Sequence, residues 1–100
     1  MKKIALLTSG GDSPGMNACI RSIVKSCLNQ SIVPIGVRDG FKGLMEGDFL
    51  EMNFGHVDNI IQLGGTILGT ARSEAFKDSE KRKVAIDHLM QHQVDGLIVL

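Results

Sequence analysis

The 100-residue sequence has no tryptophan, no tyrosine and only two prolines, and its 11 acidic residues balance its 11 basic residues. A balanced charge gives no broad field that would attract nucleic acid or an anionic membrane, so any bound anion must be held by local groups. No apolar run approaches the roughly 20 residues of a membrane-spanning helix. Met1-Lys2-Lys3 leads directly into a predicted strand, without the long apolar region of a signal peptide. We therefore expect a cytoplasmic protein with neither nucleic-acid nor membrane partners.

Cysteine is also scarce, since the sequence contains only Cys19 and Cys27. They lie eight residues apart on one predicted helix, which is too far for a disulfide within that helix. In a reducing compartment both are expected to be small buried residues rather than catalytic groups or metal ligands. The hydrophobic content of 43% and the chain length suit one small domain with a modest core.

Small residues dominate a turn-forming stretch, residues 7–17 (LTSGGDSPGMN), between a predicted strand and a predicted helix. The adjacent glycines Gly10 and Gly11 allow positive φ and leave no side chain between the backbone and a ligand. The free amides and the positive end of the helix dipole would then face one crevice, an arrangement typical of phosphate sites. A purely structural turn is the alternative. The stretch matches neither Gly-x-Gly-x-x-Gly nor Gly-Lys-Ser/Thr, the two familiar phosphate-loop patterns.

The chain alternates strand and helix patterns, which predicts an α/β fold: a three-layer sandwich with a mainly parallel sheet. Strands are expected at 3–8, 32–37 and 95–100, and helices at 15–29 and 79–93. Pro34 cannot donate to a ladder, so it indicates an edge strand or the start of a strand. Residues 49–52 indicate a further short strand, and residues 57–62 a helical turn or two.

Each long predicted helix has an apolar stripe at 3.6-residue spacing. The first stripe comprises Met16, Ile20, Ile23, Val24 and Cys27, and the second comprises Ala85, Ile86, Leu89 and Met90. His88 and His92 lie four residues apart, which would permit shared metal ligation. Because no acidic or cysteine partner is evident nearby, we interpret them as ordinary residues of a polar helix face and expect no metal site within the chain.

Four segments together resemble the bacterial ATP-dependent 6-phosphofructokinases over the whole chain: residues 8–17 (TSGGDSPGMN), 39–44 (DGFKGL), 64–72 (GGTILGTAR) and 95–99 (DGLIV). The resemblance implies a Rossmann-like, phosphofructokinase-type fold. It also implies transfer of a phosphoryl group from ATP to the 1-hydroxyl of fructose 6-phosphate, giving fructose 1,6-bisphosphate in glycolysis. Magnesium as cofactor and a homotetramer of the full-length enzyme are further implications.

Arg72 is the main catalytic candidate, because a permanently charged planar guanidinium can bind two oxygens of a transferring phosphoryl group. A structural glycine-rich loop is the alternative for this segment. The resemblance implies that Gly11, Phe41, Arg72, Ser73 and Lys77 bind ATP. Phe41 follows the turn at 38–40, where it could stack on a purine or be an ordinary core residue. Lys77 could contact phosphate or be a solvated charge.

Arg21 and Lys25 lie one turn apart off the apolar stripe and form a small basic patch, which on spacing alone suits a solvated helix face. The resemblance implies that this patch, with Asn59, holds an allosteric effector, either ADP or phosphoenolpyruvate. Several bacterial members have arginine and aspartate where this chain has Phe54 and Asn59. Since phenylalanine cannot pair with phosphate, the effector site departs from the family pattern here.

The family's second glycine-aspartate loop, its magnesium ligand, its general base and its sugar ligands all lie beyond Leu100. We therefore expect residues 1–100 to be the N-terminal part of an ATP-binding domain, without the rest of that domain and without the sugar-phosphate domain. Two alternatives remain open: a non-catalytic nucleotide- or phosphate-binding module, and a pyrophosphate-dependent phosphofructokinase. The residue that helps choose the phosphoryl donor also lies beyond this chain.

Overall fold

A computed structural model describes residues 2–9, 15–58, 60, 66–70 and 79–100. The strands in these ranges are β1 (Lys3–Leu7), β2 (Val33–Val37), β3 (Phe49–Glu51) and β4 (Gly96–Val99). The helices are α1 (Met16–Asn29), α2 (Gly40–Glu46), α3 (Phe54–Val57) and α4 (Ser79–Gln91). The predicted strands and the two long helices are confirmed, with ends that shift by one or two residues.

The strands form one sheet in the order β3-β2-β1-β4. β1 pairs in parallel with β2 and with β4, whereas β3 runs antiparallel to β2, so the mainly parallel sheet is confirmed. Pro34 is the second residue of β2, which is an inner strand, so the edge interpretation is wrong and the strand-start interpretation is right. The β3 ladder begins at Ile35, and the Pro34 carbonyl accepts a hydrogen bond from the Met52 amide at 2.8 Å.

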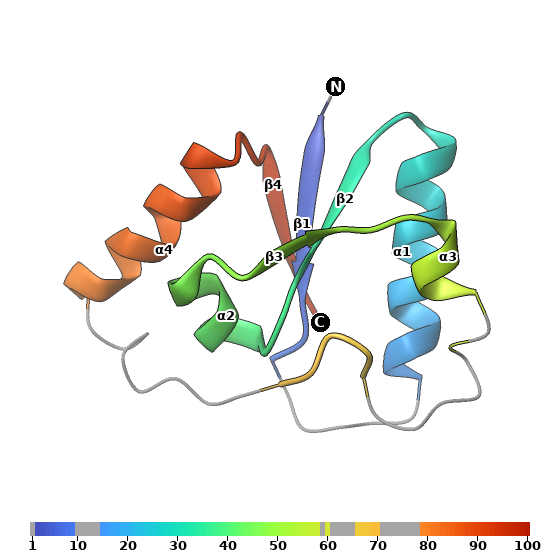
Figure 1. Cartoon of the computed structure of the whole chain (residues 1–100), viewed down its shortest axis with the longest axis horizontal. Coiled ribbons are helices and arrows are strands. Elements are labelled where there is room, and N and C mark those ends of the chain that lie inside the picture. Colours follow the sequence, from blue (N-terminus) through green and yellow to red (C-terminus); the bar gives the residue numbers. More distant parts are fainter. Residues whose placement is uncertain (1, 10–14, 59, 61–65, 71–78) are drawn as a thin grey trace.

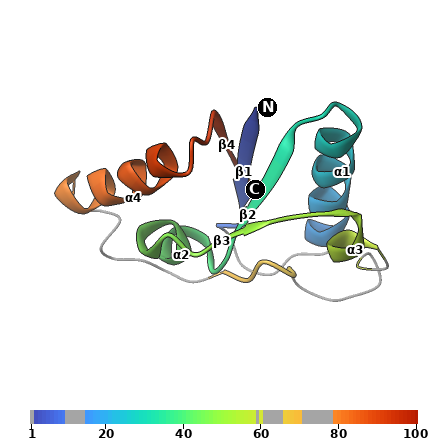
Figure 2. The ribbon, with the colours of Figure 1, turned by 45° about the horizontal axis from the view of Figure 1, so that its top comes forward.

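Alternate side chains of β1 enter two separate cores, which makes the fold a three-layer sandwich. Leu6 packs with residues of α1 and α3 on one face of the sheet. Ala5 and Leu7 pack with residues of α2 and α4 on the other face. Figures 1 and 2 show the two helix pairs on opposite sides of the strands. Leu6 and Leu7 are fully buried, and burial of a leucine side chain contributes about 1.5–3 kcal/mol.

Helix α1 packs Ile20 and Val24 of the predicted stripe into the first core and also buries Cys27. Burial raises the pKa of the Cys27 thiol, which disfavours the nucleophilic thiolate form. The expectation for Cys19 is wrong, because that residue is exposed. It immediately precedes Ile20, and one residue rotates about 100° around the helix axis, away from the buried stripe.

Two further expectations are corrected in the second half of the chain. The helical turn expected at 57–62 lies instead at Phe54–Val57, and Asp58 and Ile60 are not helical; the other expected positions lie outside the described residues. On α4, Ala85 is buried, but Ile86 is 54% exposed and Met90 is 70% exposed. In the described part of the chain, none of the helices combines the length and apolarity required to cross a membrane.

Candidate functional site at the carboxyl ends of the strands

The segments that follow the parallel strands come together at one edge of the sheet. The β1 exit, Thr8 and Ser9, meets the β4 exit, because the Ser9 amide donates to the Leu100 carbonyl at 3.0 Å. The β2 exit meets the segment 66–70, since the Asp39 amide donates to the Leu68 carbonyl at 2.8 Å. Figure 1 shows segment 66–70 below the lower ends of the strands, near the C-terminus. Open parallel sheets place their ligand crevices at this edge.

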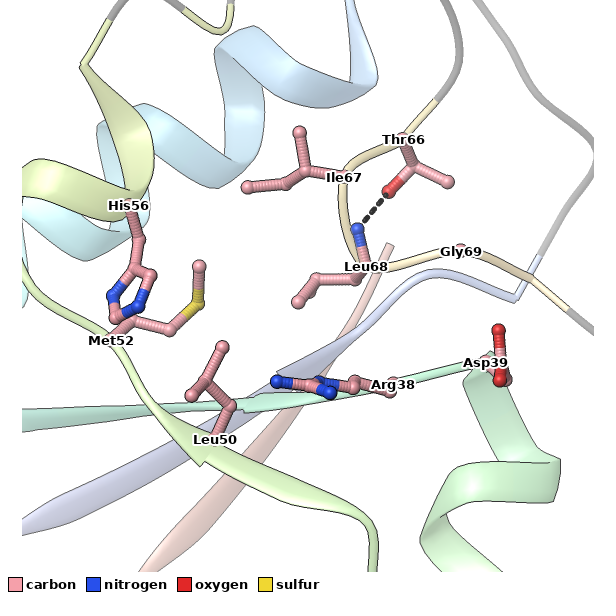
Figure 3. A pocket seen from close by; sticks show the side chains of 9 residues that line it. All are labelled: Arg38, Asp39, Leu50, Met52, His56, Thr66, Ile67, Leu68 and Gly69. Atoms are coloured by element: carbon pink, nitrogen blue, oxygen red, sulfur yellow. Dashed lines mark hydrogen bonds between the residues drawn. The ribbon is translucent and has the colours of Figure 1, made fainter.

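Thr8 links the β1 exit to segment 66–70 through its side chain. Its hydroxyl, which is fully buried, donates to the Gly69 carbonyl at 2.8 Å. Its oxygen also lies 3.3 Å from the Thr66 hydroxyl. Since Thr8 has one hydroxyl proton, already given to Gly69, Thr66 donates in that contact. Thr66 in turn accepts a hydrogen bond from the Leu68 amide at 3.2 Å, which Figure 3 shows as a dashed line.

Asn17 makes a second connection between the two glycine-rich parts of the sequence. Its side-chain Oδ1 accepts a hydrogen bond from the Ile67 amide at 2.8 Å, across 50 residues of sequence. The side chain is 2% exposed. Sequence reasoning assigned no role to Thr8, Asn17 or Thr66. One signal was present: Asn17 falls on the apolar stripe of its helix, three residues before Ile20, where a polar residue needs a hydrogen-bond partner.

A tight turn at the end of β2 brings Asp39 against Gly69. Asp39 and Gly40 have φ values of 56° and 58°, and Gly69 has a φ of 75°, so three residues here are left-handed. A Cβ on Gly69 would lie 2.7 Å from the Asp39 Oδ1 atom. Segment 66–70 therefore needs glycine at this position both for its backbone conformation and for its close approach to β2.

Most of the predicted ligand-binding residues fall outside the described residues: Gly11, Asn59, Arg72, Ser73 and Lys77. The described residues on their flanks, Thr8 and Gly69, are in direct contact. Phe41 lies on the previously unrecognised helix α2, partly buried against the second core. This packing suits the interpretation of Phe41 as a core residue. Because part of the ring is still exposed, the contact with a nucleotide stays a prediction.

The predicted effector patch lies on α1. Arg21 and Lys25 are both partly exposed. The ammonium group of Lys25 lies 3.9 Å from the Asp58 carboxylate, just past α3. Side chains this exposed gain little from pairing, because water and salt screen the charges. Asp58 therefore restrains Lys25 weakly, and phosphate could displace it.

His88 on α4 and His92, just past the end of that helix, both lie against backbone carbonyls. The Nδ1 atom of His88 lies 3.3 Å from the Leu44 carbonyl oxygen, and the Nδ1 atom of His92 lies 2.8 Å from the His88 carbonyl oxygen. Among the described residues, no three or more His, Cys, Asp or Glu side chains are grouped so that they could hold a metal ion.

A cavity of about 460 Å³ lies beside this edge of the sheet, between β3, α3 and segment 66–70. Apolar side chains from two parts of the chain form much of its wall, namely Leu50, Met52, Ile67 and Leu68. Figure 3 shows the Arg38 side chain extending along this wall, with His56 on the far side and Asp39 beside Gly69. Sequence reasoning did not identify Arg38 or His56.

The chain resembles known proteins along its whole length. The phosphofructokinase family pattern matches residues 3–100. The chain is 53% identical to the ATP-dependent 6-phosphofructokinase of Finegoldia magna and 51% identical to that of Brevibacillus brevis. Both alignments cover 100% of this chain and 31% of the relative, so the chain spans about a third of their length.

Solved structures agree with the sequence matches. The phosphofructokinase of Saccharomyces cerevisiae superimposes with a TM-score of 0.96 at 40% identity, covering 99% of this chain and 14% of that chain. A pyrophosphate-dependent phosphofructokinase from Marinobacter aquaeolei superimposes with a TM-score of 0.82 at 15% identity, covering 99% of this chain and 26% of that chain. At this low identity the match supports the fold alone. Because the family pattern covers nearly every residue, and the fold agrees, the chain belongs to the phosphofructokinase family.

Proposed function

We propose that this chain is the N-terminal part of the nucleotide-binding domain of an ATP-dependent 6-phosphofructokinase, which transfers the γ-phosphoryl group of ATP to the 1-hydroxyl of fructose 6-phosphate. The observation that carries the proposal is about 50% identity to enzymes named for this activity, along the whole chain. The contact between Thr8 and Gly69 supports it, because this contact joins the flanks of both glycine-rich loops.

Arg72 is the proposed catalytic residue. Phosphoryl transfer spreads negative charge over the equatorial oxygens of the moving group, and a preorganised cation stabilises that charge most in the transition state. The proposed ATP contacts are those of the sequence prediction: Gly11, Phe41, Arg72, Ser73 and Lys77. Magnesium would shield the charge of the ATP phosphates, and its protein ligand would lie outside this chain. We also propose that the full-length enzyme is a homotetramer.

Kinetics of Arg72 variants test this role in the gene product that contains this chain. Arg72→Ala should lower turnover by a factor of about 10² to 10³ and change the Michaelis constant for ATP much less. Arg72→Lys should recover only part of the loss, because a point charge cannot make the two-pronged contact. Undiminished turnover in Arg72→Ala, measured at saturating fructose 6-phosphate, would refute the catalytic role.

The same assay separates the alternatives. A wild-type protein that uses pyrophosphate in place of ATP would be a pyrophosphate-dependent enzyme. One that binds ATP but phosphorylates no sugar would be a non-catalytic binding module. The 15% identity to a pyrophosphate-dependent enzyme, against about 50% for the ATP-dependent relatives, favours ATP as donor.

We further propose that Arg21, Lys25 and Asn59 contact an ADP or phosphoenolpyruvate effector. Replacing Arg21 or Lys25 by alanine should weaken activation by ADP about ten-fold or more, because a charge-assisted contact to phosphate contributes roughly 1.5–3 kcal/mol. Basal turnover should remain. An activation curve identical to that of the wild type would show that Arg21 and Lys25 are only solvated charges on a helix face. That outcome would be consistent with Phe54, which stands where several bacterial members have arginine.

A further inference from the structure

The cavity between β3, α3 and segment 66–70 lies on the opposite face of the sheet from Phe41. Its wall residues Met52 and Leu68 belong to the core that packs under α1 and α3. Phe41 packs against the other core, under α2 and α4. A base stacked on Phe41 would therefore not rest on this apolar wall, which is free to contact a different group.

Backbone hydrogen bonds join β2 and its end to the residues on either side of β3, beside the cavity. The Arg38 amide donates to the Asp48 carbonyl at 3.1 Å, and the Met52 amide donates to the Pro34 carbonyl at 2.8 Å. Gly36 allows the apolar wall to pack directly on β2, because a Cβ there would lie 2.7 Å from the Met52 sulfur and 2.8 Å from a Leu68 methyl carbon. A volume of about 460 Å³ is within the usual range for small-molecule pockets.

The polar groups of the cavity are arranged asymmetrically. Arg38 is exposed and makes no ion pair with the described residues, and its guanidinium extends over the apolar wall (Figure 3). His56 Nδ1 accepts a hydrogen bond from the Asn53 amide at 3.0 Å, so in the neutral ring the proton lies on Nε2. The Asp39 carboxylate lies at Gly69, on the side away from His56 (Figure 3). The side with Arg38 and His56 therefore presents hydrogen-bond donors, and the side with Asp39 presents an acceptor.

We propose that this cavity binds a small organic anion with a flat apolar body, such as an aryl phosphate or sulfonate. The anionic group would pair with the Arg38 guanidinium, whose planar fork can bind two oxygens, and would accept from His56 Nε2. The apolar body would lie on Leu50, Met52 and Leu68. Asp39 would repel a second negative charge and so select against dianions that are charged at both ends.

Fluorescence titration with 1-anilinonaphthalene-8-sulfonate tests the proposal, because this aryl sulfonate emits strongly when it leaves water. In the gene product that contains this chain, Arg38→Gln should weaken binding at least five-fold. Lys42→Gln is the matched control, since it removes one exposed positive charge outside the cavity, on α2. Phenyl phosphate should displace the probe, and uncharged benzyl alcohol should not.

Methyl NMR locates the bound probe. The Met52 methyl signal should shift during the titration, while that of Met90, which is 70% exposed on α4, stays in place. A shift at Met90 alone, or equal weakening by Arg38→Gln and Lys42→Gln, would overturn the proposal. Absence of probe binding would also overturn it, because another part of the protein would then fill the cavity. None of these readouts depends on kinase activity, so the proposal can fail while the proposed function stands.

Discussion

The Thr8 hydroxyl shows how a single buried polar group can organise a site. It is fully buried, and it connects residues 61 positions apart in the sequence through its bond to Gly69. A buried hydroxyl or carbonyl without a partner costs roughly 1–3 kcal/mol, which is why such groups are nearly always paired. The pairing therefore holds segment 66–70 to the end of β1, and no sequence spacing could reveal it.

Replacing this hydroxyl gives a direct test at the residue scale. Thr8→Val keeps the shape but leaves the Gly69 carbonyl without its donor, so the free energy of unfolding should fall by about 1–3 kcal/mol. Thr8→Ser keeps the donor and should retain most of that stability. Urea denaturation of the gene product measures both variants. A loss in the valine variant no larger than that in the serine variant would contradict this account, because serine lacks only the methyl group and valine lacks only the hydroxyl.

Whole elements were predicted well where a local pattern sufficed. The long stripes of α1 and the apolar runs of β1, β2 and β4 are readable because their periodicity is local. Helix α2 escaped prediction because two of its seven residues are glycines, which disfavour helix, and its N-cap residue Asp39 makes no side-chain cap. It forms through packing of Leu44, Phe41 and Met45 on the second core. On α4, Ala85, Ile86 and Met90 all fit an apolar stripe, but Ala85 alone of the three is buried. Packing against the sheet, and not the local spacing, determines which side of α4 faces inward.

The close approach of α2 to the end of β2 depends on Gly43. A Cβ at this position would coincide with the backbone carbonyl oxygen of Arg38, and neither backbone can move without breaking the turn. Gly43→Ala should therefore cost about 3 kcal/mol or more. Gly96→Ala is the control, because its Cβ would meet only the end of the Ile4 side chain. Calorimetry that finds the two variants equally stable would contradict this account of the α2 contact.

At the scale of the molecule, the sheet order predicts where the structure opens first. β1 has a partner on each side, whereas the three-residue strand β3 pairs only with β2. Amides of the central strand open only when larger parts of the fold unfold. We expect the amides of Ala5, Leu6 and Leu7 to exchange with deuterium most slowly, and those of β3 much faster. Equal protection of β3 and β1 in hydrogen-exchange NMR would show that the sheet opens as one unit.

The pairing of β1 with β4 also sets the timing of folding on the ribosome. β1 is made first and meets β2 after about thirty residues, but its second partner begins only at Gly96. Closing so long a loop carries an entropic cost, and long-range parallel pairing is slow. Until translation has passed Val99, the free edge of β1 stays open to other strands, as in other incompletely folded chains. The first strand of the emerging polypeptide therefore keeps one unpaired edge until its last partner has been made.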